Sequence, residues 1–185
     1  YFFYIGGNDS MDTVAKLSKK AEEYDVKVIG VPKTIDNDLY GTDHCPGFGS
    51  AAKYIATSIM EITRDCTCYD LNSVTIIEIM GRNAGWVALE AGIATGASAI
   101  VINEVEFDED KVIADIMEAK KNNKRSFIVC IAEGVPAVLG DKLYSEKFAK
   151  RFEEKTGIET KFVRPAHILR GGNPTMRDRL LATQL

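Results

Sequence analysis

The sequence has no long hydrophobic run and no excess of positive charge. None of its apolar runs approaches the roughly 20 residues that a transmembrane helix needs, and no signal peptide is recognisable. We therefore expect no membrane partner and a cytoplasmic location. The net charge of −4 argues against nucleic acid as a partner, because binding to phosphate backbones relies on a basic surface.

Cysteine is also sparse. The spacing of the four cysteines lacks the further Cys or His ligands that a zinc site requires. We predict that all four are reduced thiols, as in most cytosolic proteins. They are Cys45, Cys66, Cys68 and Cys130.

The 185 residues alternate between strand and helix patterns, which predicts an α/β fold with parallel sheets. We expect strands at 1–5, 26–31, 73–80, 98–102, 126–132 and 159–164. We expect helices at about 11–24, 48–65, 84–95, 108–121 and 144–156, and a last one from near residue 175. The near-continuous β-branched residues of 73–80 are typical of a strand that is covered on both faces. In the first helix the apolar face is predicted to comprise Ala15, Leu17, Ala21 and Tyr24, and Trp86 is expected in the core.

A long polar loop, 32–47, follows the second expected strand and gathers Lys33, Asp36 and Asp38. The carboxyl ends of parallel strands are where open α/β sheets bind ligands. Phosphoryl transfer needs a cation for phosphate oxygens, a carboxylate to take a proton and polar groups to hold an alcohol. This loop contains such a set. A solvated charged turn is the alternative interpretation.

A second group of polar residues follows the first strand. The turn Gly6-Gly7 leads into a helix, and its backbone could approach a phosphate at the helix N-terminus. The same two glycines also fit an ordinary tight turn. Asp9 is the informative residue, because a carboxylate in a phosphate cradle repels anions unless a cation such as Lys33 lies between them.

Further candidates come from the ends of three other expected strands. Arg82 could clamp a phosphate, Glu133 could bind sugar hydroxyls, and His167 with Arg170 could bind a second phosphate. The alternatives are a surface arginine, a capping carboxylate and a structural histidine.

Taken together, these stretches resemble the phosphofructokinase family. The matching segments follow the family's order and cover nearly the whole chain: GGNDS at 6–10, PKTIDND at 32–38, MGR at 80–82, AEG at 132–134, HILRGGNPT at 167–175 and DR at 178–179. The resemblance implies a three-layer α/β/α fold in two domains, with the active site in the cleft between them. It also implies transfer of a phosphoryl group to the 1-hydroxyl of fructose 6-phosphate with Mg²⁺, as in glycolysis.

The resemblance also implies roles for single residues. Asp36 resembles the base for the 1-hydroxyl, and Arg82 lies near the transferring group. Asp9 and Lys33 complete the predicted catalytic set. The donor phosphates are assigned to Gly7, Asn8, Asp9, Ser10 and Lys33. The sugar phosphate is assigned to Thr34, Ile35, Asp36, Asp38, Met80, Gly81, Arg82, Glu133, Lys161, His167 and Arg170.

The donor follows from Asp9. Members that use ATP have glycine at this position, whereas pyrophosphate-using members have Asp there and a lysine like Lys33. We therefore expect pyrophosphate as the donor, with an ATP-dependent enzyme as the alternative and a non-catalytic sugar-phosphate-binding subunit as a second. Asn8 stands where the family usually has its Mg²⁺-binding Asp, and a neutral amide is a weaker ligand.

Two arginines that family members supply from a neighbouring subunit are replaced by Ser73 and Lys161. We expect a homo-oligomer, a dimer or tetramer, in the full-length protein. The chain is expected to be an internal piece that is inactive alone. Residues 1–47 are assigned to a donor-phosphate domain, 48–169 to a sugar-phosphate domain and 170–185 to a return to the first.

Overall fold

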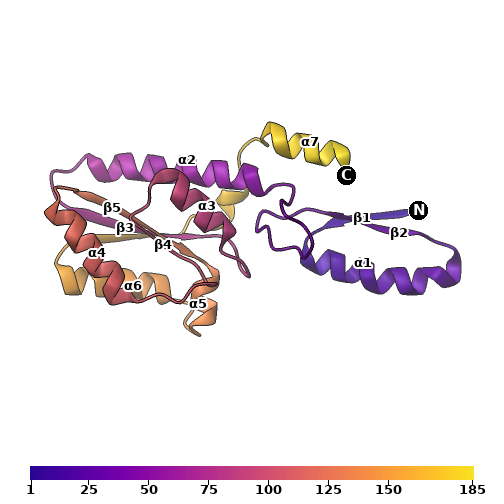
Figure 1. Ribbon diagram of the computed structural model, residues 1–185, viewed down its shortest axis with the longest axis horizontal. Coiled ribbons are helices and arrows are strands. Elements are labelled where there is room, and N and C mark those ends of the chain that lie inside the picture. Colours follow the sequence, from indigo (N-terminus) through magenta and orange to yellow (C-terminus); the bar gives the residue numbers. More distant parts are fainter. The chain divides into compact units, whose positions relative to one another are not determined.

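A computed structural model describes residues 1–185 (Figure 1). The chain divides into two compact units, which are described separately. Unit 1 comprises Tyr1–Ser50 and Asn173–Leu185, and unit 2 comprises Ala51–Gly172. The sequence-based domain boundaries, after residues 47 and 169, remain predictions.

Unit 1 contains a two-stranded parallel sheet. Strand β1 (Phe2–Gly6) pairs with β2 (Val28–Pro32), in register from Phe2 opposite Val28 to Gly6 opposite Pro32. Helix α1 (Asn8–Ala21) and the short 3₁₀ helix η1 (Glu22–Tyr24) connect the two strands. Because the strands are parallel and in register, the segments that follow them both leave from the carboxyl-terminal end of the sheet.

Helix α1 begins three residues earlier than predicted, and its predicted apolar face is only partly correct: Leu17, Ala21 and Tyr24 line an apolar pocket with Phe2 and Val28 of the sheet. Ala15 is exposed, and Leu17 and Tyr24 are 41% and 69% exposed. The helix also turns Met11 and Val14 toward Gly30 of β2, where an added Cβ would lie 2.8 Å from the Met11 sulfur. The predicted helix included Met11 and Val14, but the predicted apolar face left both of them out.

Residues 33–47 contain no helix or strand apart from one parallel bridge between Thr34 and Gly47. Asn37 organises this loop: its side-chain oxygen accepts a hydrogen bond from the Cys45 N–H at 2.8 Å, and its Nδ2 donates to the Asp43 carbonyl at 3.2 Å. Asn37 has φ of 55°, a left-handed conformation that asparagine tolerates better than most residues. The loop therefore has a defined structure although it is long.

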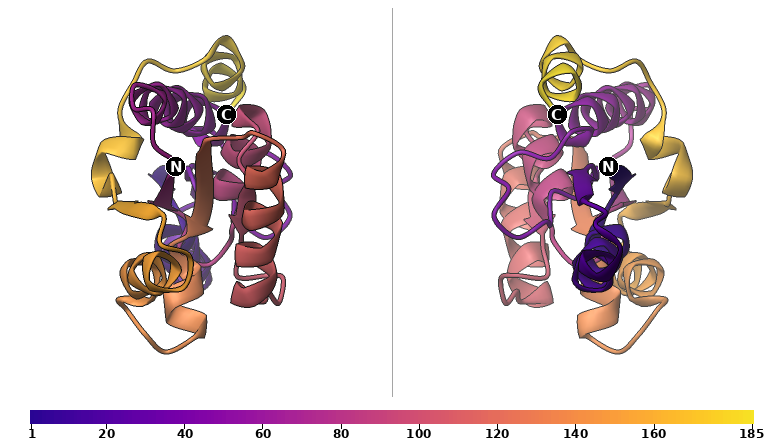
Figure 2. Two further views of the ribbon diagram at one scale, coloured as in Figure 1. Left: turned by 90° about the vertical axis from the view of Figure 1, so that its left-hand side faces the viewer. Right: turned by 90° about the vertical axis from the view of Figure 1, so that its right-hand side faces the viewer.

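Unit 2 is a four-stranded parallel sheet in the order β4-β5-β3-β6. Helices lie on both sides of this sheet (Figure 2), which confirms the predicted three-layer α/β class. All seven residues of β3 are buried, as the β-branched pattern predicted. The strands are β3 (Ser73–Ile79), β4 (Ala99–Val101), β5 (Ser126–Ala132) and β6 (Glu159–Val163).

The helices correspond to the predicted segments, with two short additions. The long helices are α2 (Phe48–Thr67), α3 (Trp86–Thr95), α4 (Glu109–Lys121), α6 (Tyr144–Thr156) and α7 (Met176–Gln184). The additions are α5 (Gly134–Val138) and the 3₁₀ helix η2 (Ala166–Arg170). The Asp108 side chain caps α4 by accepting a hydrogen bond from the Asp110 N–H at 2.9 Å.

The core of unit 2 is aromatic and β-branched. Trp86 does not belong to it, contrary to expectation, since it is 48% exposed at the first position of α3. The largest fully buried side chains around the sheet are Phe127, Phe148, Phe152, Ile76, Ile77, Ile79 and Ile131. All four cysteines are unpaired thiols, as predicted. None of the helices combines the length and apolar character that crossing a membrane would require.

Candidate functional site

The turn between β1 and α1 has a specific need for glycine at position 6. A Cβ on Gly6 would overlap the side chain of Ser10. Gly7 differs, because an added Cβ would make only ordinary contacts, 3.5 Å from the Lys33 carbonyl. Gly7 is the N-cap of α1 and provides no side-chain hydrogen bond. The first-turn N–H groups of α1 therefore have no side-chain cap, which suits a loop that receives an anion.

The polar loop lies directly beside this turn. The Lys33 N–H donates to the Gly6 carbonyl at 2.9 Å, which extends the β1–β2 pairing by one residue. The Asn8 Nδ2 donates to Oδ2 of Asp38 at 2.6 Å. The structure thus brings the predicted donor-phosphate residues and the predicted catalytic loop together at one edge of the unit 1 sheet.

Inside the loop, Thr34 positions Asp36. The Thr34 hydroxyl accepts a hydrogen bond from the Asp36 N–H at 3.2 Å, a local turn typical of threonine. The side chain of Ile35 packs near Gly47, where an added Cβ would lie 3.5 Å from Ile35 Cγ2. Asp36 and Asp38 are half-buried, whereas Asp9 and Lys33 are exposed. The edge therefore presents a lysine and a carboxylate to solvent and holds two further carboxylates in the loop.

Asp178 supports this region from α7. It is 5% exposed, and its Oδ2 accepts hydrogen bonds from the Ser50 N–H at 2.8 Å and from the Ser50 hydroxyl. Burial raises the pKa of the Asp178 carboxyl, but hydrogen bonds from Ser50 and the Gly47 backbone outweigh this effect and leave the pKa below its usual value. Asp178 thus remains ionised where the polar loop joins α2.

In unit 2 the turn after β3 also requires glycine. Gly81 has φ of 136°, and an added Cβ would lie 2.5 Å from the Ala84 carbonyl oxygen. Met80 is buried at 7% exposure, whereas Arg82 is exposed. Of the three residues of the predicted sugar-phosphate turn, only Arg82 therefore presents a long side chain to solvent.

Glu133 and Arg82 come together at the carboxyl ends of β5 and β3. The Glu133 N–H donates to the Ile79 carbonyl at 2.8 Å, and an added Cβ on Gly134 would lie 2.7 Å from the Arg82 carbonyl oxygen. Both side chains line a pocket of about 560 Å³, together with Glu78, Pro136, Ala137, Gly140, Lys142 and Arg164. Cations and carboxylates at the end of a parallel sheet are suited to a phosphorylated sugar.

Sequence analysis missed Glu78 and Arg164 in this pocket. Glu78 is the only charged residue of β3 and is 7% exposed. A carboxylate in a strand covered on both faces requires a partner. A glutamate in this apolar run was therefore the sequence feature from which an ion pair could have been predicted. The partner is Arg164, whose Nε and terminal nitrogen donate to the two Glu78 oxygens at 2.6 and 3.2 Å.

The remaining predicted residues lie elsewhere in unit 2. His167 and Arg170 are exposed on η2, which Leu169 anchors at 1% exposure. Lys161 lies opposite Thr75 within the sheet, with its Nζ 4.9 Å from the centre of the Tyr69 ring. None of the three lines the pocket of Arg82 and Glu133.

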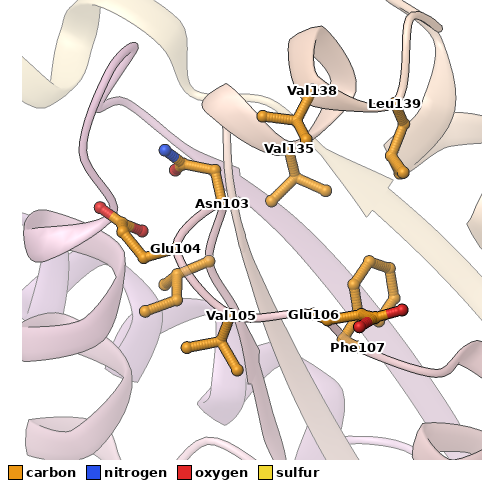
Figure 3. A pocket seen from close by; sticks show the side chains of 9 residues that line it. Asn103, Glu104, Val105, Glu106, Phe107, Val135, Val138 and Leu139 are labelled. Atoms are coloured by element: carbon orange, nitrogen blue, oxygen red, sulfur yellow. The ribbon is translucent and has the colours of Figure 1, made fainter.

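A second pocket of about 330 Å³ contains none of the predicted residues. In Figure 3 aliphatic side chains of α5 face the segment after β4. Glu104 in this segment has a structural role, since its Oε1 accepts a hydrogen bond from the Gly85 N–H at 2.7 Å. No group of three or more His, Cys, Asp or Glu side chains is arranged to hold a metal ion.

The chain resembles phosphofructokinases over nearly its whole length. The chain is 41% identical over 181 residues to ATP-dependent 6-phosphofructokinase 1 of Clostridium perfringens, covering 98% of this chain and 53% of the relative. It is 40% identical to ATP-dependent 6-phosphofructokinase of Clostridium tetani, with the same coverage. The chain thus spans about half the length of the curated relatives it matches.

Solved structures give the same result. The crystal structure of pyrophosphate-dependent phosphofructokinase from Marinobacter aquaeolei matches with a TM-score of 0.80 and 32% identity, covering 99% of this chain and 48% of that one. Pichia pastoris phosphofructokinase in the T-state matches with a TM-score of 0.81 and 29% identity, covering 98% of this chain and 21% of that one. The family model for phosphofructokinase matches residues 1–185. The chain belongs to the phosphofructokinase family.

Proposed function

We propose that the full-length protein transfers a phosphoryl group from pyrophosphate to the 1-hydroxyl of fructose 6-phosphate, giving fructose 1,6-bisphosphate and phosphate. Family membership supports a phosphotransferase of glycolysis. The observation that carries the choice of donor is Asp9, an exposed carboxylate in the first turn of α1 beside Gly7. A nucleotide α-phosphate that approached this turn would meet both the volume and the charge of Asp9.

The names of the relatives do not select the donor. The two Clostridium relatives are named ATP-dependent, whereas the Marinobacter structure is named pyrophosphate-dependent. The 41% identity to an ATP-dependent enzyme favours ATP as the second candidate. The third candidate, a non-catalytic sugar-phosphate-binding subunit, is disfavoured because the chain retains both Asp36 and Arg82.

In the proposed reaction the Asp36 carboxylate accepts the proton of the 1-hydroxyl, and the resulting alkoxide attacks the nearer phosphorus of pyrophosphate. The bond to the bridging oxygen breaks and phosphate leaves. Lys33 balances the charge of the donor. Thr34 fixes the Asp36 backbone, as described above. The sugar phosphate is held by the residues of unit 2: Met80, Gly81, Arg82, Glu133, His167 and Arg170.

The paired side chains of Asn8 and Asp38 fit a role in holding Mg²⁺, which usually takes one or two protein carboxylates together with water and substrate phosphates. Asp38 offers a carboxylate, and the Asn8 amide next to it offers a neutral oxygen if the amide is turned over. When bound, the ion would neutralise charge on the transferring phosphates. Oligomeric assembly, with Lys161 serving a neighbouring subunit, a cytoplasmic location and inactivity of the isolated chain remain predictions.

The test is a steady-state assay of the full-length protein with each donor. We expect the wild type to use pyrophosphate in preference to ATP. Asp9→Gly should admit ATP at least weakly and reduce the pyrophosphate rate. Asp12→Gly, at an exposed position of the same helix, controls for the effect of glycine on helix stability. A wild type that prefers ATP would exclude the pyrophosphate assignment.

A further inference from the structure

Glu78 and Arg164 form a charge pair that the pairing of β3 with β6 dictates. Ile77 lies opposite Val163 in this parallel pair, so the next residue of each segment, Glu78 and Arg164, becomes a cross-strand neighbour on one face. The guanidinium binds both carboxylate oxygens, at 2.6 and 3.2 Å. This fork–fork geometry is the strong form of an ion pair.

The pair lies inside the pocket proposed to hold the sugar phosphate. The pocket contains three cationic side chains, Arg82, Lys142 and Arg164, and two carboxylates, Glu78 and Glu133. Without Arg164 the cations and carboxylates would be equal in number. The hydrogen bond that Arg164 donates to Glu78 raises the pKa of Arg164, and the negative charges of Glu78, Glu146 and Glu133 add to this effect. The guanidinium therefore stays charged in the pocket.

An uncompensated Glu78 would harm the binding of an anion in two ways. Its carboxylate, only 7% exposed, would repel a phosphate ester that bound in the same pocket. It would also attract the guanidinium of Arg82, which lines the same pocket and would then be drawn away from substrate. Arg164 prevents both effects because it already occupies the two oxygens of Glu78.

We propose that Arg164 is a positioning residue for sugar-phosphate binding, which neutralises Glu78 and thereby leaves Arg82 available to the anionic substrate. This inference rests on the proposed function of the pocket. It makes Arg164 act through Glu78 rather than through contact with substrate. Its effect should therefore depend on whether residue 78 carries a charge.

The experiment compares Arg164→Ala, Glu78→Gln and the double variant in the full-length protein, with KM measured for fructose 6-phosphate and for the donor. Arg164→Ala should raise the sugar-phosphate KM by about tenfold, because it leaves the buried carboxylate of Glu78 without the charged partner that binds both of its oxygens. The donor KM should not change. In the double variant the sugar-phosphate KM should return to within about threefold of the wild type, because the unpaired charge is gone.

A KM that stays raised in the double variant would mean that Arg164 contacts substrate directly, which would overturn the inference. An unchanged KM in folded Arg164→Ala would also overturn it. If Arg164→Ala does not fold, Arg164→Lys decides, because it keeps the charge without the fork. We expect a KM within about threefold of the wild type for Arg164→Lys, and a tenfold rise would contradict neutralisation as the cause.

The pair Arg151–Glu109 provides a matched control, since Arg151 also donates to both oxygens of a glutamate in unit 2. Neither residue lines the pocket. Arg151→Ala should lower the melting temperature without changing the sugar-phosphate KM. The proposed function is tested separately: wild-type enzyme that phosphorylates no fructose 6-phosphate with either donor refutes that function, whereas an active wild type with an insensitive Arg164→Ala refutes only this inference.

Discussion

The Asn8 side chain donates a 2.6 Å hydrogen bond to the carboxylate of Asp38, which joins the start of α1 to the polar loop after β2. A carboxylate at position 8 could not make this donation and would face Asp38 as a like charge. Asn8→Asp should therefore destabilise the Mg²⁺-free protein. It should also lower the Mg²⁺ concentration needed for half-maximal activity, because a second carboxylate strengthens a site for a hard cation.

Thermal unfolding with and without Mg²⁺, together with a Mg²⁺ titration of activity, checks this expectation. Ala15→Asp adds one carboxylate at an exposed position of the same helix and controls for net charge. If Asn8→Asp leaves both the unfolding temperature and the Mg²⁺ requirement unchanged, the ion does not bind at the Asn8–Asp38 pair.

Asp36 provides the second prediction. It is half-buried in the loop, and its N–H is bonded to Thr34. Asp36→Asn should lower kcat by about 10² to 10⁴, the usual contribution of a positioned general base, with little change in the KM of either substrate. Asp43→Asn, at an exposed position of the same loop, is the control. Near-normal turnover of Asp36→Asn would exclude Asp36 as the base.

The sequence predicted the class and order of the elements because each long element has a strong local signal. Strand β5 coincides with the predicted 126–132, and α6 coincides with 144–156 up to its left-handed C-cap, Gly157. The errors arose where local signals were weak or misleading. The 3₁₀ helix η2 and the five-residue helix α5 have no apolar period long enough to detect. The predicted apolar face of α1 omitted Met11 and Val14, although both lay within the predicted helix.

The site could be predicted only in part for a similar reason. Arg82 and Glu133 follow strands, so their meeting at one edge of a parallel sheet was foreseeable. The pairing of Glu78 with Arg164, which lie 86 positions apart in the sequence, depends on β6 lying beside β3. That adjacency is a property of the sheet order and leaves no local pattern in the sequence.

Arg170 provides the third prediction, which distinguishes binding of the sugar phosphate from binding of the donor. Its side chain is exposed on η2 and is proposed to contact the 6-phosphate. Arg170→Ala should raise the KM for fructose 6-phosphate by about tenfold through loss of a charge-assisted hydrogen bond, while the donor KM stays constant. Arg125→Ala removes another exposed arginine of unit 2 and should change neither constant. A raised donor KM with an unchanged sugar KM would refute this assignment.

The last prediction concerns stability in acid. The pKa of Asp178 is held below its usual value by hydrogen bonds that outweigh the effect of burial, so the unfolded chain binds a proton at this residue more readily than the folded protein does. The stabilising contribution is thus fully present above the ordinary aspartate pKa of about 3.9 and is lost as the pH falls through the lower folded value. Asp178→Asn should lower the free energy of unfolding by about 1–3 kcal/mol at pH 7 and should reduce the loss of stability below about pH 4.

Urea unfolding of the full-length protein between pH 7 and pH values below 4 measures both effects. Asp65→Asn, at an exposed position of α2, should show neither, and an Asp178→Asn variant that retains the wild-type acid slope would show that the Asp178 carboxylate does not stabilise the fold.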